Sequence, residues 1–498
     1  MTIAARPLAT LFGMYLLVSS YAAAQANPDL NRLLAGPAIT DRLHALSWSA
    51  SGDNFDIAQT ATAGAPGRHA SSYSLQASWA PGQSVELDWS LHTHYPFPTD
   101  LAYVESLDGS GGGTIIGVDG FRPTPEGPLP SARVAMRSKL LWMGTPVLLL
   151  SQAEGVRPIS GRQGAHAFTA VGTAWNVQLD IATGFPVRIS TREDDPMYGT
   201  VEASMEYSAW TNVDGVFMPT RLEYRVDGQL IRRERRESLS IELSAGGEEL
   251  SAGGEARTVS PPLDIARFAK GWTMAHWFLS RVSLGGPQDQ DVAEPVELLE
   301  VAQGVYQVLG GPTHSLVIES TEQLTVVDAP WYPERSEAVL ASLRARWPDK
   351  PVGRLIVTHH HHDHNGGVMT FAAAGIPITV HALNRDYFFD ALSRQGVGAV
   401  RIESVGEQAN LMLGDRAAEL YEVPSAHADG MLVVYLPDEA FLFNSDLYSP
   451  GRATQHPLWS AELLQAVRFY ALPVERFAGA HGRGVESMDH LEQIASAQ

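Results

Sequence analysis

The chain has 498 residues, which exceeds the size of one compact domain and predicts two or three. Its 56 acidic and 35 basic residues give a formal net charge of −21, and this acidity argues against nucleic acid as a partner. The chain contains no cysteine, which excludes disulfides, thiolate metal ligands, a cysteine nucleophile and a lipid anchor on cysteine.

Residues 1–26 have the pattern of a secretory signal peptide. Arg6 gives a short basic start, an apolar stretch runs from Leu8 to Val18, and small residues around Ala24 and Ala26 offer cleavage sites. The apolar stretch is too short to span a bilayer, which takes about 20 residues. We therefore expect an exported protein, periplasmic or secreted, with no integral membrane segment after cleavage of the leader.

Residues 27–242 are predicted to form a β-rich domain, because short alternating runs of Trp, Tyr, Val and Thr are broken by Gly, Pro, Asn and Asp. The Val-Asp-Gly sequences at 213–215 and 226–228 predict turns between strands. The strand and turn pattern over 180–219 resembles that of lipoprotein-carrier-like half-barrels. This resemblance implies a curved antiparallel sheet with one apolar face, able to hold a greasy ligand. We favour the alternative, a structural domain that packs on the C-terminal half.

Residues 243–294 are expected to connect this domain to the next one. The sequence Leu-Ser-Ala-Gly-Gly-Glu occurs at 243–248 and again at 250–255, and so small and Gly-rich a repeat cannot bury a core. Apolar residues at helical spacing then predict a helix over about 264–282. A polar segment at 285–294 ends the connector.

From residue 295 to the C-terminus, short apolar strands alternate with helices. Strands are predicted at 315–319, 324–328, 354–358, 377–381, 431–436 and 440–444, and helices at 334–347, 367–374 and 460–470. Such alternation with extra hairpins predicts an α/β sandwich. The fold class expected for the whole chain is therefore α+β, with a β-rich domain followed by a sandwich.

A histidine cluster lies where a predicted apolar strand leads into a helix, and it reads His-His-His-His-Asp-His at 359–364. His359 and His361 are two residues apart, so at a strand end their imidazoles point to the same side and can share one metal. Asp363 and His364 lie where the chain turns into the helix and can face a second metal. Imidazole and carboxylate are natural ligands of zinc and also suit iron or manganese.

This His-x-His-x-Asp-His motif resembles that of the metallo-β-lactamase superfamily, over about residues 295–498. The resemblance implies an αββα sandwich and three further ligands at later strand ends, for which the sequence offers His427, Asp446 and His481 in that order. It implies that the first metal is bound by His359, His361 and His427, and the second by Asp363, His364 and His481. Asp446 would bridge the two metals.

Other polar residues near the motif are given different roles. Asp328 matches a family aspartate behind the site and is expected to orient a ligand rather than bind metal. His360 and His362 are expected to point away from the metals. His314 and His381 could lie near the site and are left out of the ligand set. The pair His92 and His94, in the β-rich domain, is interpreted as ordinary strand residues.

The predicted function is a binuclear metal-dependent hydrolase with two divalent ions, zinc expected and iron or manganese as alternatives. A hydroxide bridging the metals would attack an ester, lactone, lactam or thioester in a small-molecule substrate. Asp363 would orient this nucleophile and carry its proton. Three alternatives stay open: a mononuclear iron dioxygenase of sulfur compounds, a β-lactamase, and a non-enzymatic envelope carrier. The sequence carries no signal for the oligomeric state.

Overall fold

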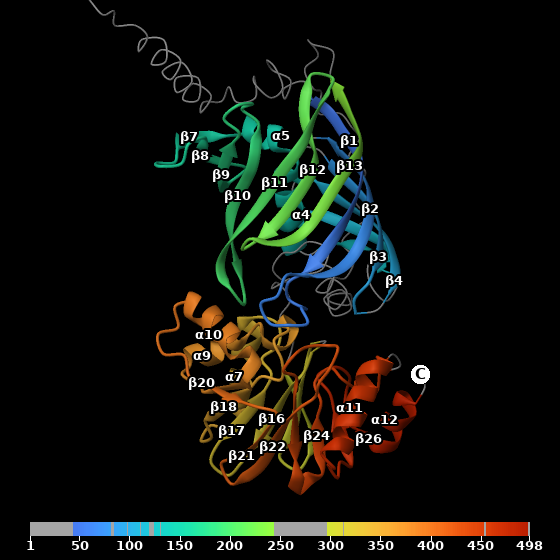
Figure 1. Ribbon diagram of the computed structural model, residues 1–498, viewed down its shortest axis with the longest axis vertical. Coiled ribbons are helices and arrows are strands. Elements are labelled where there is room, and N and C mark those ends of the chain that lie inside the picture. Colours follow the sequence, from blue (N-terminus) through green and yellow to red (C-terminus); the bar gives the residue numbers. More distant parts are fainter. Residues whose placement is uncertain are drawn as a thin grey trace, which may run out of the picture.

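The computed structural model describes residues 43–243 and 296–496, apart from short gaps at 81–83, 97, 110, 119–123, 130, 312 and 453–454. The predicted leader at 1–26, the repeats of the connector and the predicted helix at 264–282 lie outside the described residues. The described part forms two regions, an N-terminal sheet region and a C-terminal sandwich region, which meet at one end of each (Figure 1).

The N-terminal region is one continuous antiparallel sheet of 13 strands, which confirms the β-rich prediction. Its order is β6-β5-β4-β3-β2-β1-β13-β12-β11-β10-β9-β8-β7, so the first and last strands of the region pair in the middle. The strands are β1 (Leu43–Asp56), β2 (Arg68–Ala80), β3 (Ser84–Thr93), β4 (Thr99–Asp108), β5 (Gly113–Val118), β6 (Thr124–Pro128), β7 (Glu154–Pro158), β8 (Ala165–Ala170), β9 (Thr173–Leu179), β10 (Pro186–Asp195), β11 (Gly199–Val213), β12 (Val216–Val226) and β13 (Gln229–Leu243).

The sheet curves around two helices, α4 (Ser131–Gly144) and α5 (Pro146–Ser151) (Figure 1). Strand β3 shows why: its residues alternate strictly between exposed and buried, and the buried Val85, Leu87, Trp89 and Leu91 are apolar. That set packs in one cluster with Leu140 and Met143 of α4. The concave face therefore holds the core, and the exposed residues of β3 lie on the convex face.

Two tight hairpins fall where Val-Asp-Gly predicts turns. Asp214 and Gly215 join β11 to β12 with φ of 47° and 91°, and Asp227 and Gly228 join β12 to β13 with φ of 50° and 78°. Two successive positive φ angles define the hairpin turn that matches the twist of paired strands, and Asp-Gly adopts it readily. The local sequence thus fixes the register of the three longest neighbouring strands in this half of the sheet.

The C-terminal region contains two stacked sheets. The first has the order β14-β15-β16-β17-β18-β19-β20 and the second β21-β22-β23-β24-β25-β26. Their strands are β14 (Glu297–Ala302), β15 (Val305–Leu309), β16 (Ser315–Glu319), β17 (Leu324–Val327), β18 (Val352–Ile356), β19 (Ile378–His381), β20 (Ile402–Val405), β21 (Gln408–Leu413), β22 (Arg416–Glu422), β23 (Leu432–Leu436), β24 (Phe441–Phe443), β25 (Arg476–Ala478) and β26 (Glu486–Ser487).

Helices cover the outer face of each sheet, and they are α7 (Pro333–Arg346), α9 (Val368–Ala373), α10 (Arg385–Arg394), α11 (Pro457–Phe469) and α12 (Met488–Ala495). The single turn α8 (His362–Asn365) follows β18 at the strand edge, and short 3-10 turns are η2 (Ala382–Asn384) and η3 (Pro437–Glu439). One apolar cluster joins the first sheet to α7, α9 and α10, and another joins the second sheet to α11 and α12. A third cluster lies between the sheets, for example Val327 and Ile356 with Val434 and Phe443. These three layers of contact make an αββα sandwich.

Several strands that lead to the site run parallel. Strands β17, β18, β19 and β20 pair in parallel in the first sheet, as do β24 and β25 in the second. Parallel neighbours end at the same edge, so the loops that follow them gather there. No helix within the described residues is long and apolar enough to cross a membrane.

Candidate metal centre

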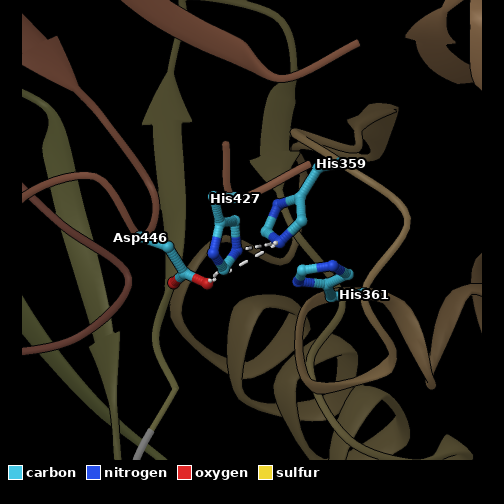
Figure 2. A group of neighbouring side chains, drawn as sticks. All are labelled: His359, His361, His427 and Asp446. Atoms are coloured by element: carbon cyan, nitrogen blue, oxygen red, sulfur yellow. Dashed lines mark hydrogen bonds and ion pairs between the residues drawn. The ribbon is translucent and has the colours of Figure 1, made fainter. Parts of the chain in front are cut away.

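Two groups of potential metal ligands lie side by side at the edge where the sandwich faces the N-terminal sheet. The first group is His359, His361, His427 and Asp446 (Figure 2), and the second is Asp363, His364, Asp446 and His481. Within each group the ligand atoms all lie within 4.8 Å of one another. Every residue predicted as a ligand from the sequence therefore belongs to a group, and Asp446 belongs to both.

Strand ends bring these side chains together. His359 and the residues up to His364 follow β18, Asp446 follows β24, and His481 follows β25. His427 lies in the turn between β22 and β23. Since these strands end at one edge of the two sheets, residues more than a hundred positions apart in the chain become neighbours.

The first group is built around one carboxylate oxygen. Asp446 Oδ2 lies 2.9 Å from His427 Nε2 and 3.6 Å from His359 Nε2, and the two Nε2 atoms lie 3.2 Å apart. Figure 2 shows the ring nitrogens of His359 and His427 turned toward each other and toward the carboxylate. Two imidazole nitrogens converging in this way can both offer their lone pairs to one metal ion.

The second group uses the other oxygen of Asp446. Asp446 Oδ1 lies 2.8 Å from His364 Nε2 and 3.0 Å from His481 Nε2. Asp363 Oδ2 lies 3.4 Å from His364 Nε2 and 3.7 Å from His481 Nε2. The carboxylate of Asp446 thus presents one oxygen to each group, which is the arrangement that a bridging ligand requires.

One ring nitrogen of the site is buried without a hydrogen-bond partner among the described residues, and it is His361 Nδ1. The Nε2 of His361 lies 2.9 Å from the carbonyl oxygen of Thr60 and donates to it, which leaves a lone pair on the buried Nδ1. A buried polar atom without a partner costs about 1–3 kcal/mol. A divalent metal ion would satisfy this atom, and the imidazole and carboxylate donors of the site suit such an ion.

The electrostatics of the first ligand group favour the protonation states that a metal needs. Burial, followed by the neighbouring imidazoles, lowers the pKa of His359 and of His361 well below the usual range, so both are neutral. Burial disfavours the charged form of Asp446, but the neighbouring His364 and His481 hold its pKa well below the usual range. Burial also disfavours the charged form of His364, but the Asp446 carboxylate raises its pKa well above the usual range, so a metal ion bound there would displace a proton. Neutral imidazoles and an ionised carboxylate are the forms that bind metal.

Residues of the sandwich region orient two of the ligands from behind. Asp328 accepts hydrogen bonds from the backbone N–H and the hydroxyl of Thr358, at 2.8 and 2.9 Å, and its Oδ2 lies 3.3 Å from His364 Nδ1. The hydroxyl of Thr358 lies 3.0 Å from His359 Nδ1. Each ring nitrogen held this way leaves Nε2 facing the site, so the expected orienting role of Asp328 is supported by its contacts.

Residues of the N-terminal sheet region orient three more of the candidate metal ligands. Gln59 Nε2 donates to Asp363 Oδ1 at 2.6 Å, and the carbonyl of Thr60 accepts from His361. The hydroxyl of Tyr95 lies 3.2 Å from Gln59 Oε1 and 3.3 Å from His427 Nδ1. A hydroxyl that donates to the amide oxygen and accepts from His427 Nδ1–H fixes the tautomer with Nε2 free for a metal.

The loop that carries Gln59 is tied to the sandwich at several points. Backbone Ala58 O accepts from His362 N at 3.2 Å, Ala61 O accepts from Asp429 N at 2.7 Å, and Thr62 Oγ1 donates to Asp429 Oδ2 at 2.5 Å. The N-terminal region is thus more than a domain packed on the sandwich, because it supplies part of the metal centre's surroundings. Sequence reasoning missed these residues, since no motif or spacing marks them.

The remaining histidines lie outside both groups. His360 Nε2 lies 2.9 Å from Thr60 O, and His362 Nε2 lies 2.9 Å from Tyr387 OH, so both point away from the ligands as expected. His381 Nε2 lies 3.4 Å from Glu422, and His314 is buried, which lowers its pKa to about 3. His92 lies in β3 and pairs with Asp100 at 2.8 Å, which agrees with an ordinary strand residue, whereas the same prediction is wrong for His94, because β3 ends at Thr93.

Residues 308–465 match the family model described as the metallo-beta-lactamase superfamily. This stretch holds every ligand candidate except His481. The C-terminal part of the chain therefore belongs to the metallo-β-lactamase superfamily, preceded by a large β-rich region, and the α+β class is confirmed. The family fold implies divalent-metal binding, and the two ligand groups could hold metal.

Individual relatives that match the chain cover about 40% of it. The 2,4-dinitroanisole O-demethylase subunit alpha of Nocardioides sp. (strain JS1661) is 26% identical over 204 residues, which are 40% of this chain and 62% of that relative. The chain thus spans less than two thirds of the relative's length. A metallo-β-lactamase from Pontibacter korlensis is 20% identical and covers 40% of this chain and 97% of its own, with a TM-score of 0.33. The metallo-β-lactamase FIM-1 from Pseudomonas aeruginosa, in its mono-zinc form, is 18% identical and covers 40% and 93%, with a TM-score of 0.34.

Proposed function

We propose that the chain is a binuclear metal-dependent hydrolase that cleaves an ester, lactone, lactam or thioester bond in a small molecule. The observation that carries this proposal is the placement of Asp446, whose two oxygens each face a separate set of imidazole ligands. A single-metal centre would need only one of these sets. The proposed ions are two zinc ions, because the donors are imidazole nitrogens and carboxylate oxygens.

Two divalent ions, when bound, supply an activated water near neutral pH and a Lewis acid for the substrate oxygen. The chain's own residues then decide geometry and access. Asp446 sets the separation of the two positions, since its oxygens serve one group each. His481 is the most exposed of the ligands, with 19% of its side chain accessible, so the substrate is proposed to enter on its side.

Asp363 is proposed to orient the attacking water and to carry its proton. Its Oδ2 faces His364 and His481, while its Oδ1 accepts the hydrogen bond from Gln59. Burial disfavours the charged form, but the neighbouring His364 lowers the pKa of this carboxyl below its usual value. An ionised carboxylate held by a fixed donor is suited to accept a proton at a defined position.

A second candidate function is O-demethylation, which the name of the Nocardioides relative favours. In this chain it would use the same metal centre and act on a methyl ether bond. The iron-dependent oxygenation of sulfur compounds is less well supported, because both ligand groups are complete. Export to the periplasm or to the medium stays a proposal that rests on the sequence of residues 1–26.

The test is the metal content of the purified chain, combined with a hydrolysis screen before and after chelation. The screen contains esters, lactones, lactams, thioesters and 2,4-dinitroanisole. Close to two zinc ions per chain with chelator-sensitive cleavage would support the hydrolase, and cleavage of 2,4-dinitroanisole alone would select O-demethylation. One iron per chain without hydrolysis would contradict the proposal, as would wild-type turnover in a metal-free Asp446→Ala variant.

A further inference from the structure

A cavity lies between α4 and the concave face of the N-terminal sheet, apart from the metal centre. Its volume is about 50 Å³. The apolar lining includes Leu75, Leu140 and Leu222, and three arginines, Arg137, Arg232 and Arg236, also line it. None of the lining residues contacts a candidate metal ligand through a hydrogen bond of the described structure. A cavity that mixes leucines with guanidinium groups is unusual for a core that has only a structural role.

The guanidinium groups share few carboxylates. Glu234 accepts from Arg232 at 2.5 Å and from Arg236 at 3.1 Å. Glu105 pairs with Arg137 at 2.5 Å and with Arg133 at 2.6 Å. Within the described residues, each carboxylate of this cluster thus serves two guanidiniums. Arginine does not lose its proton in proteins, and the cavity lining holds three arginines but one carboxylate, Glu234, so positive charge predominates in the lining.

Donor groups of the cavity lining are left without partners. Arg137 Nη1, Arg236 Nη1 and Trp48 Nε1 are buried and have no hydrogen-bond acceptor among the described residues. Both arginine side chains are 2% exposed. Their remaining contacts include aromatic faces, with Arg137 4.4 Å from the ring centroid of Trp89 and Arg236 4.8 Å from that of Trp48. Unpaired donors on a buried charged group are costly and call for an acceptor.

Water alone would satisfy the donors but not the charge. A water molecule accepts a hydrogen bond from a guanidinium, yet it adds no negative charge to a region that burial has already removed from solvent. Burial lowers the pKa of Arg137 and of Arg236, which agrees with their incomplete compensation. An anion would supply both the acceptor and the charge. The leucines around it would contact an apolar chain attached to that anion.

We propose that this cavity binds a carboxylate with a short apolar chain, whose oxygens accept from the guanidinium groups of Arg137 and Arg236. A cavity of 50 Å³ has room for about four water-sized groups, since each needs about 10–15 Å³. A carboxylate head and two or three methylene groups fill such a space. Butyrate is therefore the probe, and this site is independent of the proposed hydrolase activity.

The test measures binding of sodium butyrate to the full chain by isothermal titration and by the rise of the melting temperature. Sodium chloride at equal ionic strength, butan-1-ol and inorganic phosphate are the comparison solutes. A ligand that binds the folded state raises the melting temperature with concentration. We expect butyrate to bind and the comparison solutes not to. Equal effects of butyrate and sodium chloride would overturn the proposal, and so would equal binding of butan-1-ol or of phosphate.

Variants locate the site. Arg137→Met leaves Glu105 paired with Arg133, and Arg236→Met leaves Glu234 paired with Arg232, so neither strands a buried carboxylate. We expect each variant to fold, to keep the wild-type metal content and to bind butyrate at least tenfold more weakly. The matched control is Arg235→Met. Arg235 lies on the same strand as Arg236 but is 67% exposed, so this variant should bind butyrate like the wild type. Wild-type affinity in the Arg137→Met, Arg236→Met double variant would overturn the assignment.

A carboxylate could also bind at the metal centre, and one further variant separates the two sites. Asp446→Ala removes the residue shared by both ligand groups and does not touch the cavity. We expect butyrate to bind this variant as it binds the wild type. Loss of butyrate binding in Asp446→Ala would place the carboxylate at the metal centre and overturn the proposal.

Discussion

Both regions of the molecule bury a cluster of charged groups, and the two clusters differ in the type of basic side chain that pairs with the carboxylate. In the N-terminal sheet the partners of Glu105 and Glu234 are arginines. In the sandwich the partners of Asp446 are histidines. Both clusters leave buried nitrogen atoms without a hydrogen-bond partner in the described structure.

The difference decides which ligand each cluster can take. A guanidinium is always charged and has donors only, so its unpaired atoms attract an anion. An imidazole can be neutral, and burial keeps His359 and His361 so by lowering their pKa. A neutral imidazole offers a lone pair and therefore attracts a metal cation. The N-terminal region also contributes to the metal centre, because Gln59, Thr60 and Tyr95 contact its candidate ligands.

The largest effect is expected from the carboxylate proposed to carry the proton. Asp363→Asn keeps the shape of the side chain but removes the charge and the proton acceptor, and we expect kcat/KM to fall by about three orders of magnitude or more. Steady-state kinetics with metal content determined in parallel measures this. Asp386→Asn, at an exposed position, is the control and should keep wild-type kinetics. Unchanged turnover with two metals bound would contradict the role of Asp363.

The next effect tests the arginine cluster, by which we mean the buried arginines that pair with Glu105 and Glu234. Glu234→Gln removes the carboxylate that Arg232 and Arg236 share, which leaves two buried cations without it. Removing one partner of a buried ion pair costs about 3–5 kcal/mol, and we expect the free energy of unfolding to fall by that amount. Urea unfolding followed by tryptophan fluorescence measures it. Glu237→Gln, on the exposed side of the same strand, should unfold at the wild-type urea concentration. A wild-type midpoint for Glu234→Gln would show that the cluster is not buried as described.

A smaller effect tests the link between the two regions. Tyr95→Phe removes the hydroxyl that contacts His427 Nδ1 and Gln59, and we expect metal affinity to fall about 10- to 100-fold, as is typical when a group that orients a ligand is lost. Competition with a chromophoric chelator measures the affinity without relying on activity. Tyr387→Phe is matched, because its hydroxyl contacts His362, which is not a ligand. If both variants bound metal like the wild type, the N-terminal region would not tune the centre.

The smallest effect is a pH dependence from a histidine beside the centre. Burial lowers the pKa of His314 to about 3, whereas an unfolded histidine titrates near 6.5. Between these two pKa values the unfolded state binds one more proton than the folded state does. The stability that the neutral His314 contributes is therefore fully present above pH 6.5 and is lost as the pH falls toward 3. One group contributes at most about 1.4 kcal/mol per pH unit. Unfolding free energies at pH 7 and pH 5 should therefore differ less in His314→Asn than in the wild type, while His92→Asn should match the wild type. An unchanged pH dependence in His314→Asn would contradict this.

The sequence by itself determined what depends on local spacing. Residues 359–364 lie within six consecutive positions at a strand end, so the alternation of side chains and the following turn place them without help from the rest of the chain. The Asp-Gly turns at 214–215 and 227–228 are equally local. His427, Asp446 and His481 followed from the family resemblance, and the structure brings them to the same edge as the motif.

Only the tertiary structure decided what depends on contacts between distant parts. Gln59 and Asp363 are 304 positions apart, and Tyr95 and His427 are 332 positions apart. No periodicity links such pairs, because their meeting depends on how the curved sheet docks onto the sandwich. The arginine cluster is similar: alternation marks Arg232, Glu234 and Arg236 as sharing one face of β13, but polarity alone predicts that this face is exposed. The curvature of the sheet around α4 is what turns it inward, where burial makes charge and missing partners matter.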